Sequence, residues 1–274
     1  MLPRSLKGAA EKLSAPVGMV QDSLRQHQAL RYTAHRPWPP PDGPWLMGQT
    51  WVGLLFAHWR VPKQALERVV PAQLPIDTYE GSAWLAVTPF MVRGLRLRAT
   101  PPLPLLSSFP EINVRTYVTV DGRPGIYFLS LDAGSRLGVH GARLTYRLPY
   151  FHARASARSD GQRMEFHSKR ISKDGPPASF RGRYGPDGDP LPFVEGSLER
   201  WLTERYCLYT FDERLRVQRG EIHHPPWQLQ PASAEIATNT MTNPLDISLE
   251  GEPLLHFSAR QDVVIWSIQP VAER

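Results

Sequence analysis

A strictly alternating segment followed by a two-residue turn limits the folds open to this chain. Over residues 111–120, mostly aliphatic side chains occupy the even-numbered positions and polar or aromatic ones the odd-numbered positions. Alternation with period two is typical of a β-strand, and Asp121-Gly122 favours a tight hairpin turn. The apolar run at residues 125–132 fits the returning strand. The sequence therefore predicts an antiparallel hairpin near the middle of the chain.

Further short extended runs alternate with turns along the rest of the chain. Strand-like runs cover residues 50–59, 83–92, 141–157, 220–227 and 254–268. Residues 172–192, rich in Gly, Pro, Asp and Ser, predict a long irregular loop. Helical patterns are short: residues 61–70 begin with Pro62, and Ser197 is a candidate N-cap for a helix through about Tyr206. We predict a mainly β (α+β) fold, an antiparallel β-barrel or sheet, closed or partly closed, with a few peripheral helices.

The first 46 residues differ in character from the rest. Residues 5–31 carry leucine and valine at helical spacing, and Pro16 interrupts the pattern, so two short helices are predicted. Residues 35–45 are too proline-rich for a helix or a central strand, and predict an extended strap anchored by its tryptophans. We therefore divide the chain into a helical extension with a proline-rich strap, residues 1–46, and a β domain, residues 47–274.

The distribution of charge and cysteine restricts partners and compartment. The net charge is +6, and residues 1–36 hold six basic and two acidic side chains, so the rest is nearly neutral. No basic run with interleaved aromatic residues follows, so nucleic-acid binding is not predicted, and a solvated tail is the simplest interpretation of the N-terminus. No apolar run approaches the roughly 20 residues that cross a bilayer, so no integral membrane segment is predicted. A single cysteine, Cys207, fits a reducing, cytoplasmic compartment.

The polar face of residues 111–120 has two interpretations. It can face solvent, as one side of many antiparallel sheets does. It can instead line a polar cavity inside a barrel, where Glu111, Arg115 and Tyr117 could hold a carboxylate or carbonyl ligand. Because Glu111 directly follows Phe109-Pro110 at the entrance of the strand and not in a turn, we favour the cavity.

Three segments in this region resemble a known family. They read Ser107-Ser-Phe-Pro-Glu-Ile-Asn-Val-Arg-Thr-Tyr-Val118, Gly125-Ile-Tyr-Phe-Leu-Ser-Leu-Asp-Ala133 and Gly141-Ala-Arg-Leu-Thr-Tyr-Arg-Leu-Pro-Tyr150. With them the chain resembles the YqjF-like proteins, an uncharacterised branch of the acetoacetate decarboxylase-like superfamily, over about residues 35–266. The resemblance implies that residues 47–274 form a β domain of acetoacetate decarboxylase-like type.

The same resemblance argues against one mechanism. Acetoacetate decarboxylases form a Schiff base between a lysine and the substrate ketone, and Glu111 looks like the counterpart of a glutamate of theirs. In this chain Pro149 is kept, but Tyr150 stands at the lysine position and Arg143 at that of an acidic residue. A phenol cannot form an imine. The five lysines lie elsewhere, at Lys7, Lys12, Lys63, Lys169 and Lys173. Decarboxylation through an imine is therefore not expected.

The candidate site combines the cluster and the resemblance. We predict Tyr150 and Glu111 as catalytic residues, with Tyr150 as a general acid or hydrogen-bond donor. The predicted substrate-binding residues are Arg115, Arg143, Tyr117 and His58. The two arginines could clamp a carboxylate. Two alternatives stay open: Tyr150 packs as a plain aromatic residue, or the arginines form ion pairs with Glu111 or Asp132.

No metal or cofactor is predicted. His223 and His224 are adjacent, so on a strand they point to opposite faces, and no HExxH motif, phosphate-binding glycine loop or nucleophile elbow is present. Two functional classes remain. One is a small-molecule-binding barrel, an enzyme without a covalent amine that acts on an oxo- or carboxylate-bearing metabolite. The other is a non-catalytic ligand-binding or structural domain that retains the scaffold. Exposed sheet edges would permit a homo-oligomer.

Overall fold

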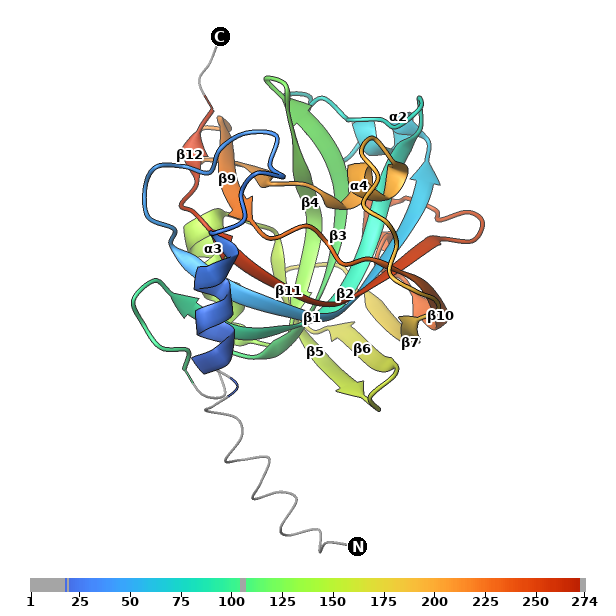
Figure 1. The fold of residues 1–274 in the computed structure, drawn as a ribbon. Coiled ribbons are helices and arrows are strands. Elements are labelled where there is room, and N and C mark those ends of the chain that lie inside the picture. The colour runs from blue at the N-terminus through green and yellow to red at the C-terminus, as the bar shows by residue number, and fades with distance from the viewer. Residues whose placement is uncertain (1–17, 19, 104–106, 272–274) are drawn as a thin grey trace, which may run out of the picture.

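The protein is built around one continuous twelve-stranded sheet (Figure 1). The structure is a computed structural model that describes residues 18, 20–103 and 107–271. The strands are β1 (Met47–Val61), β2 (Ala83–Leu97), β3 (Phe109–Val120), β4 (Arg123–Ala133), β5 (Tyr150–Ser159), β6 (Met164–Arg170), β7 (Ser179–Pro186), β8 (Cys207–Phe211), β9 (Val217–His223), β10 (Gln230–Asn239), β11 (Leu254–Ile265) and β12 (Gln269–Pro270). Residues 20–29 are helical, and the other helices are α2 (Lys63–Glu67), α3 (Arg136–Tyr146), α4 (Leu198–Thr203) and the 3₁₀ helix η1 (Asn243–Leu245). The predicted mainly β fold with a few peripheral helices is confirmed. None of the described helices has the length and hydropathy needed to cross a bilayer.

Two pairings close this sheet on itself. Its strands follow the order β12-β9-β8-β4-β3-β2-β1-β11-β10-β7-β6-β5, and β4 also pairs with β5, and β9 with β11. The first pairing closes a ring of nine strands and the second a ring of seven, within the described residues. Strands β4, β3, β2, β1 and β11 belong to both rings. Most pairs are antiparallel as predicted, whereas β4 runs parallel to β5 and to β8.

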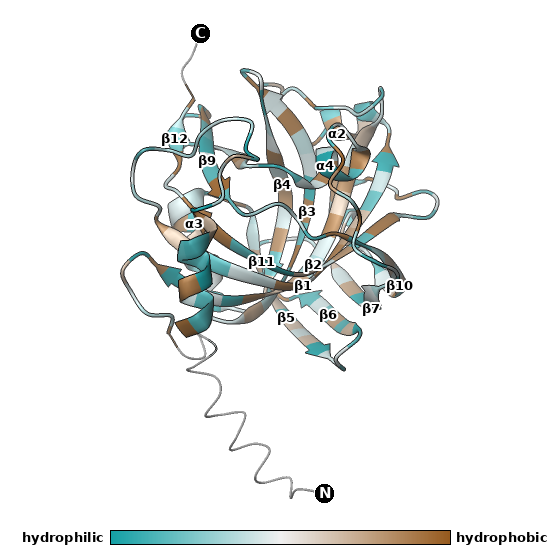
Figure 2. Ribbon diagram, viewed as in Figure 1, coloured by the Kyte–Doolittle hydropathy of each residue, from teal (hydrophilic) through white to brown (hydrophobic). Residues whose placement is uncertain are grey.

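The shared strands bury both of their faces. One face packs into the core of the nine-strand ring, where Leu55, Val87 and Val114 share a hydrophobic cluster with Phe166 of β6 and Phe180 of β7. The other face looks into the seven-strand ring. Both hydrophobic and hydrophilic residues occur along these strands (Figure 2). A strand that is buried on both sides has no need of a polar face, which explains the nearly continuous apolar run in β1.

Residues 141–157 were predicted to be extended, and their first part is helical instead. Residues 141–146 complete α3, and Ser135 caps this helix by accepting a hydrogen bond from the backbone N–H of Gly138 at 3.1 Å. Strand β5 begins only at Tyr150. Gly138 and Gly141 lie inside the helix, and glycine is a poor helix former, so local propensity conceals it.

The predicted irregular loop at residues 172–192 contains a strand. β7 pairs with β6 on one side and with β10 on the other. It carries glycine, proline and arginine, which are not typical of strands, so its extended conformation follows from long-range pairing.

The N-terminal segment packs against the sheet over its described part, contrary to the expected solvated tail. Residues 20–29 are helical. Asp22 in this helix is buried and forms ion pairs with Arg93 at 3.3 Å and with Arg260 at 2.9 Å. Gln26 is fully buried. Residues 5–17, where the first predicted helix falls, lie outside the described residues.

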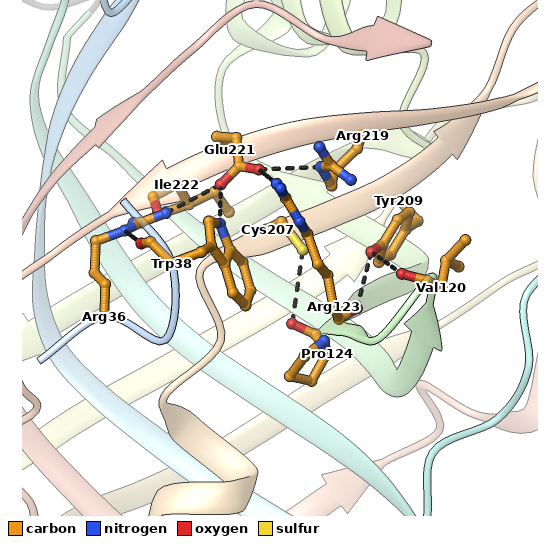
Figure 3. Close-up of polar contacts among 10 residues, drawn as sticks. All are labelled: Arg36, Trp38, Val120, Arg123, Pro124, Cys207, Tyr209, Arg219, Glu221 and Ile222. Carbon is orange, nitrogen blue, oxygen red and sulfur yellow. Dashed lines mark hydrogen bonds and ion pairs between the residues drawn. The ribbon is translucent and has the colours of Figure 1, made fainter. Parts of the chain in front are cut away.

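Glu221 of β9 fastens the proline-rich strap to the sheet (Figure 3). Its carboxylate accepts hydrogen bonds from Arg36 at 3.0 Å and from the indole N–H of Trp38 at 2.8 Å. Arg123 and Arg219 lie within 3.3 Å and 3.0 Å of the same carboxylate. The guanidinium of Arg36 is fully buried, so it depends on the Glu221 carboxylate to neutralise its charge. The strap thereby covers the outer face of β9.

We expect Glu221→Gln to lower the free energy of unfolding by about 2 kcal/mol, because a neutral amide cannot compensate the buried Arg36 guanidinium. Urea unfolding measures the loss. Glu213→Gln is the matched control, since Glu213 is 90% exposed in its ion pair with Arg147, and it should cost less than about 0.5 kcal/mol. Equal losses in the two variants would show that the strap does not depend on the Glu221 charge.

Candidate functional site

A cavity of about 620 Å³ lies within the seven-strand ring. Each strand of that ring contributes at least one lining residue, and α3 and the loop after β2 line one end. Most of the described lining residues are apolar. The charged or titratable exceptions, apart from tyrosine, are Arg96, Glu111, Arg115, Arg205 and His224. A cavity of this size with few polar groups is typical of a small-molecule site.

The odd-numbered face of β3 forms one wall of this cavity. Glu111, Asn113 and Arg115 line it and are 5%, 4% and 5% exposed. The even-numbered Ile112 and Val114 point into the opposite core. Of the two interpretations of the alternating segment, the solvent-exposed face is wrong, because both sides of this shared strand are covered.

An irregularity in β1 between Val52 and Ala57 sets which side chains this strand turns toward the cavity. Trp51 and Leu54 both line it although they are three residues apart, so the alternation is interrupted between them. The register of β1 against β2 shifts in this region. Gly53 has a φ of +61°, and a β-carbon there would lie 2.8 Å from the sulfur of Met164, so glycine is required.

Tyr150 and Glu111 meet in the cavity. The Tyr150 hydroxyl donates a hydrogen bond of 3.1 Å to Glu111 Oε2. Burial raises the pKa of Glu111 to about 8, while the hydrogen bond from Tyr150 opposes that rise. Burial and the neighbouring carboxyl group raise the pKa of Tyr150 well above 10. Both groups therefore hold their protons at neutral pH, and Glu111 is the stronger acid of the pair.

Arg115 is a buried cation without an acidic partner. Among the described residues no carboxylate lies within ion-pair distance of its guanidinium, and its Nε has no hydrogen-bond partner. The guanidinium lies 5.2 Å from the centre of the Phe56 ring. Isolated buried charges are costly, so an anionic ligand that pairs with this guanidinium would remove a cost. The alternative of an ion pair between Arg115 and Glu111 is therefore wrong.

Arg205 adds a second guanidinium to the cavity wall. It forms an ion pair of 2.8 Å with Asp77, and its Nη2 has no hydrogen-bond partner. Arg115 and Arg205 both lie near the Tyr117 hydroxyl and lower the pKa of Tyr117, although burial outweighs them and raises it overall. With two guanidinium groups and one carboxylate, this end of the cavity carries a net positive charge.

Tyr117 and His58 lie behind Arg115 and are not among the described lining residues. A hydrogen bond of 2.7 Å joins the Tyr117 hydroxyl to His58 Nε2, and both side chains are fully buried. Burial and the charge of Arg115 lower the pKa of His58 well below 6.5, so this imidazole is neutral. The structure brings the pair beside the predicted site without exposing it to a ligand.

Arg143 is not brought into the cavity. It lies on α3, donates a hydrogen bond of 2.6 Å from Nε to the backbone oxygen of Tyr150, and pairs with Asp174 at 2.7 Å. The carboxylate clamp predicted from Arg115 and Arg143 is therefore not assembled. Arg143 instead fixes the main chain that presents the Tyr150 side chain.

Asp132, the other carboxylate in that alternative, pairs with Arg170 and not with Arg115 or Arg143. Three hydrogen bonds of 2.7–3.2 Å join the two side chains, which are 0% and 2% exposed. Arg170 also lies 3.9 Å from the centre of the Phe151 ring. Because Asp132 is on β4 and Arg170 on β6, this pair spans β5 at the point where the nine-strand ring closes.

Thr88, Asn113 and Arg205 line the cavity and were not among the site residues predicted from the sequence. Thr88 pairs directly with Asn113 across β2 and β3, and the side-chain oxygens of both have no hydrogen-bond partner. Asn113 belongs to the alternating face, so its position in the strand could have identified it. Thr88 and Arg205 carry no local signal, because distant segments of the chain bring them to the cavity.

Lysine and histidine side chains are the groups that could support imine formation or metal binding. Of the described lysines, Lys63, Lys169 and Lys173, none lines the cavity. His223 faces the N-terminal helix, where its ring forms a hydrogen bond with the backbone oxygen of Ala29, whereas His224 lines the cavity. No cluster of three or more potential metal ligands occurs among residues 18, 20–103 and 107–271.

Comparisons with known proteins agree with this architecture. The model of a family described as an uncharacterized conserved protein (COG2071), DUF2071, matches residues 48–262. The uncharacterized protein YqjF of Bacillus subtilis (strain 168) is 47% identical over 230 residues, which cover 84% of this chain and 94% of YqjF. Acetoacetate decarboxylase from Legionella pneumophila subsp. pneumophila str. Philadelphia 1 has a TM-score of 0.57 at 12% identity, over 87% of this chain and 93% of that one. The enduracididine biosynthesis enzyme MppR complexed with pyruvate has a TM-score of 0.56 at 11% identity, with the same coverage. The predicted decarboxylase-like fold is confirmed.

Proposed function

Because the chain belongs to the DUF2071 family of uncharacterized conserved proteins and has an acetoacetate decarboxylase-like fold, we propose that it binds a small carboxylate- or oxo-bearing metabolite in the cavity of the seven-strand ring. The observation that carries this proposal is the buried guanidinium of Arg115, which lines the cavity without an acidic partner among the described residues. A carboxylate ligand would compensate that charge through strong, charge-assisted hydrogen bonds. The complex of MppR with pyruvate, an oxo acid, is consistent with a ligand of this class.

The residues around Arg115 support recognition of the polar head. Thr88 and Asn113 have side-chain oxygens without partners, and Arg205 adds positive charge on the same wall. Buried polar groups in proteins are nearly always hydrogen-bonded, so unsatisfied ones that line a cavity are candidates to contact a ligand. The donors among these residues, the two guanidinium groups and the Thr88 hydroxyl, fit a ligand with two or more acceptor oxygens, whereas Asn113 Oδ1 can only accept a hydrogen bond.

Glu111 and Tyr150 support acid catalysis on such a ligand. With a pKa raised to about 8, the Glu111 carboxyl group is protonated at neutral pH and still acidic enough to donate its proton to a developing oxyanion. Tyr150, which donates to Glu111, orients the carboxyl group and holds its own proton. With no described lysine on the wall, this chemistry proceeds without an imine. If the protein only binds its ligand, binding would depend on Arg115 and would be unchanged in Glu111→Gln.

Arg115→Met is expected to weaken carboxylate binding and to stabilise the fold. Loss of a charge-assisted contact should weaken binding of pyruvate and longer oxo acids by about 10- to 100-fold. Removal of an uncompensated buried charge should raise the free energy of unfolding by about 1–2 kcal/mol. Isothermal titration calorimetry measures the loss of binding, and a thermal-shift assay measures the gain in stability.

Arg154→Met is the matched control, since Arg154 is exposed on β5 and does not line the cavity. It changes the net charge equally and should leave oxo-acid binding unchanged. Equal binding by the Arg115→Met variant and the wild-type protein would reject the proposed function, and a destabilised Arg115→Met variant would contradict the view of Arg115 as uncompensated.

A further inference from the structure

We infer, on the basis of the proposed carboxylate binding, that the ligand is an amphipathic monocarboxylic acid whose hydrocarbon chain extends from Arg115 to a cavity mouth between α3 and residues 100–103. The hydrocarbon chain is the part of the ligand that lies beyond the polar head. The direction of the cavity, the chemistry of its wall, the exposure of its rim and its volume each favour such a ligand.

The charged end and the mouth lie far apart along β3. Phe109 begins the strand and lies against Gly138 of α3, whose β-carbon position is 3.3 Å from the ring. Arg115 follows six residues later, which corresponds to roughly 20 Å of extended strand. At the Arg115 end, the lining residues Thr203 and Arg205 are both 3% exposed, so this end is closed. A ligand whose carboxylate reaches Arg115 must therefore occupy the length of the cavity.

The wall between the two ends is mostly apolar. Its buried members include Phe90, Ile126, Phe128, Leu208, Ile222 and Trp227. Glu111 is the only acidic side chain among the described lining residues, and at neutral pH it is protonated and does not repel an anion. A small hydrophilic acid would leave most of this wall in contact with water, whereas a hydrocarbon chain would cover it.

Leucine side chains surround the mouth. Leu97, Leu103 and Leu137 line the cavity and yet are 54%, 59% and 63% exposed. Single exposed leucines are common on protein surfaces, but three around one opening form an apolar rim that continues into the apolar wall. Such a rim favours access of a hydrocarbon chain over access of a compact polar metabolite.

The volume sets the length of the chain. About 620 Å³ holds roughly twenty groups of the size of a water molecule, which each take ~30 Å³. Ligands do not fill their pockets completely, so this space fits a carboxylate with a chain of about 10 to 16 carbon atoms. Shorter acids would fill only part of it.

Straight-chain saturated acids from butanoate to hexadecanoate test the inference, titrated calorimetrically below their critical micelle concentrations. Affinity should rise about three- to fourfold per added methylene up to a chain of about 10–16 carbons and then level off. Dodecanol should bind at least tenfold more weakly than dodecanoate, because it cannot pair with Arg115.

Gly141→Phe tests the path of the chain. A β-carbon at Gly141 of α3 meets no atom within 4 Å, so the ring can partly block the mouth without disturbing packing. Dodecanoate affinity should fall at least tenfold, while butanoate and pyruvate bind within twofold of wild type. Leu144→Phe, on the same helix at a position 82% exposed and outside the lining, should change neither. Ala142→Phe provides a second blocking variant, and circular dichroism verifies that each variant is folded.

The outcomes separate the inference from the proposed function. Arg115-dependent binding of pyruvate and butanoate with no gain for dodecanoate would overturn the inference and leave the proposed function intact. Tight dodecanoate binding that Gly141→Phe and Ala142→Phe leave unchanged would overturn the assigned path and mouth. The proposed function and the inference would both be overturned if no acid binds, or if Arg115→Met leaves binding unchanged.

Discussion

Asp132→Asn is expected to lower the free energy of unfolding by about 3–5 kcal/mol, because it leaves the buried guanidinium of Arg170 without its counter-charge. Burial raises the pKa of Asp132, and the Arg170 guanidinium opposes that shift, so the two charges depend on each other. Guanidinium chloride or urea unfolding at neutral pH measures the loss. The nine-strand ring closes through only three residue pairs between β4 and β5, and this ion pair reinforces them.

Glu67→Gln is the matched control for Asp132→Asn. Glu67 forms an ion pair of 3.6 Å with Lys63 in which both side chains are about half exposed, so its loss should cost less than about 0.5 kcal/mol. Because Tyr150 is on β5 beside the Asp132–Arg170 pair, Asp132→Asn should also weaken ligand binding. A loss of stability below about 1 kcal/mol would show that the ring closes without the help of this pair.

Glu111→Gln is expected to make stability less dependent on pH. The pKa of Glu111 is about 8 in the folded protein and about 4.5 in the unfolded chain, so the folded state binds one more proton between those values. Stability of the wild-type protein from this group is therefore fully present below about pH 4.5 and is lost as the pH rises to about 8. The loss amounts to roughly 4 kcal/mol. Relative to wild type, Glu111→Gln should gain that amount between pH 5 and pH 9.

Urea unfolding of both proteins at one-unit pH intervals gives the difference curve, in which titrations common to both proteins cancel. Tyr150→Phe supplies a diagnostic shift: it removes a hydrogen bond that lowers the pKa of Glu111, so the midpoint should move to higher pH. Glu67→Gln, at an exposed position, should give a flat difference curve. A flat curve for Glu111→Gln as well would show that Glu111 is ionised in the folded protein at neutral pH.

The sequence predicted the site where the information is local and missed it where the information is distributed. The alternation over residues 111–120 and the segment around Tyr150 identified Glu111, Arg115 and Tyr150, three of the residues that line the cavity. Spacing along a strand determines which side chains share a face, so this part of the site can be predicted. It does not tell which of two covered faces holds a cavity.

Other parts of the site depend on pairings between distant segments. Arg205 reaches the cavity from the turn after α4, and Thr88 reaches it from β2, and no pattern at either position indicates a ligand. Arg143 was predicted in a strand, where it would have faced the site, and the helix α3 carries it outside instead. The double closure of the sheet is likewise set by long-range pairings that alternation alone does not specify.

The five strands shared by the two rings have a consequence for the evolution of this protein. Along β3, even-numbered positions such as Ile112 and Val114 pack in the core of the nine-strand ring, whereas Glu111, Asn113 and Arg115 line the cavity. A mutation on one face leaves the other face of the same strand unchanged. The chain can therefore acquire a new ligand preference through substitutions at alternate residues, without losing the scaffold that holds them.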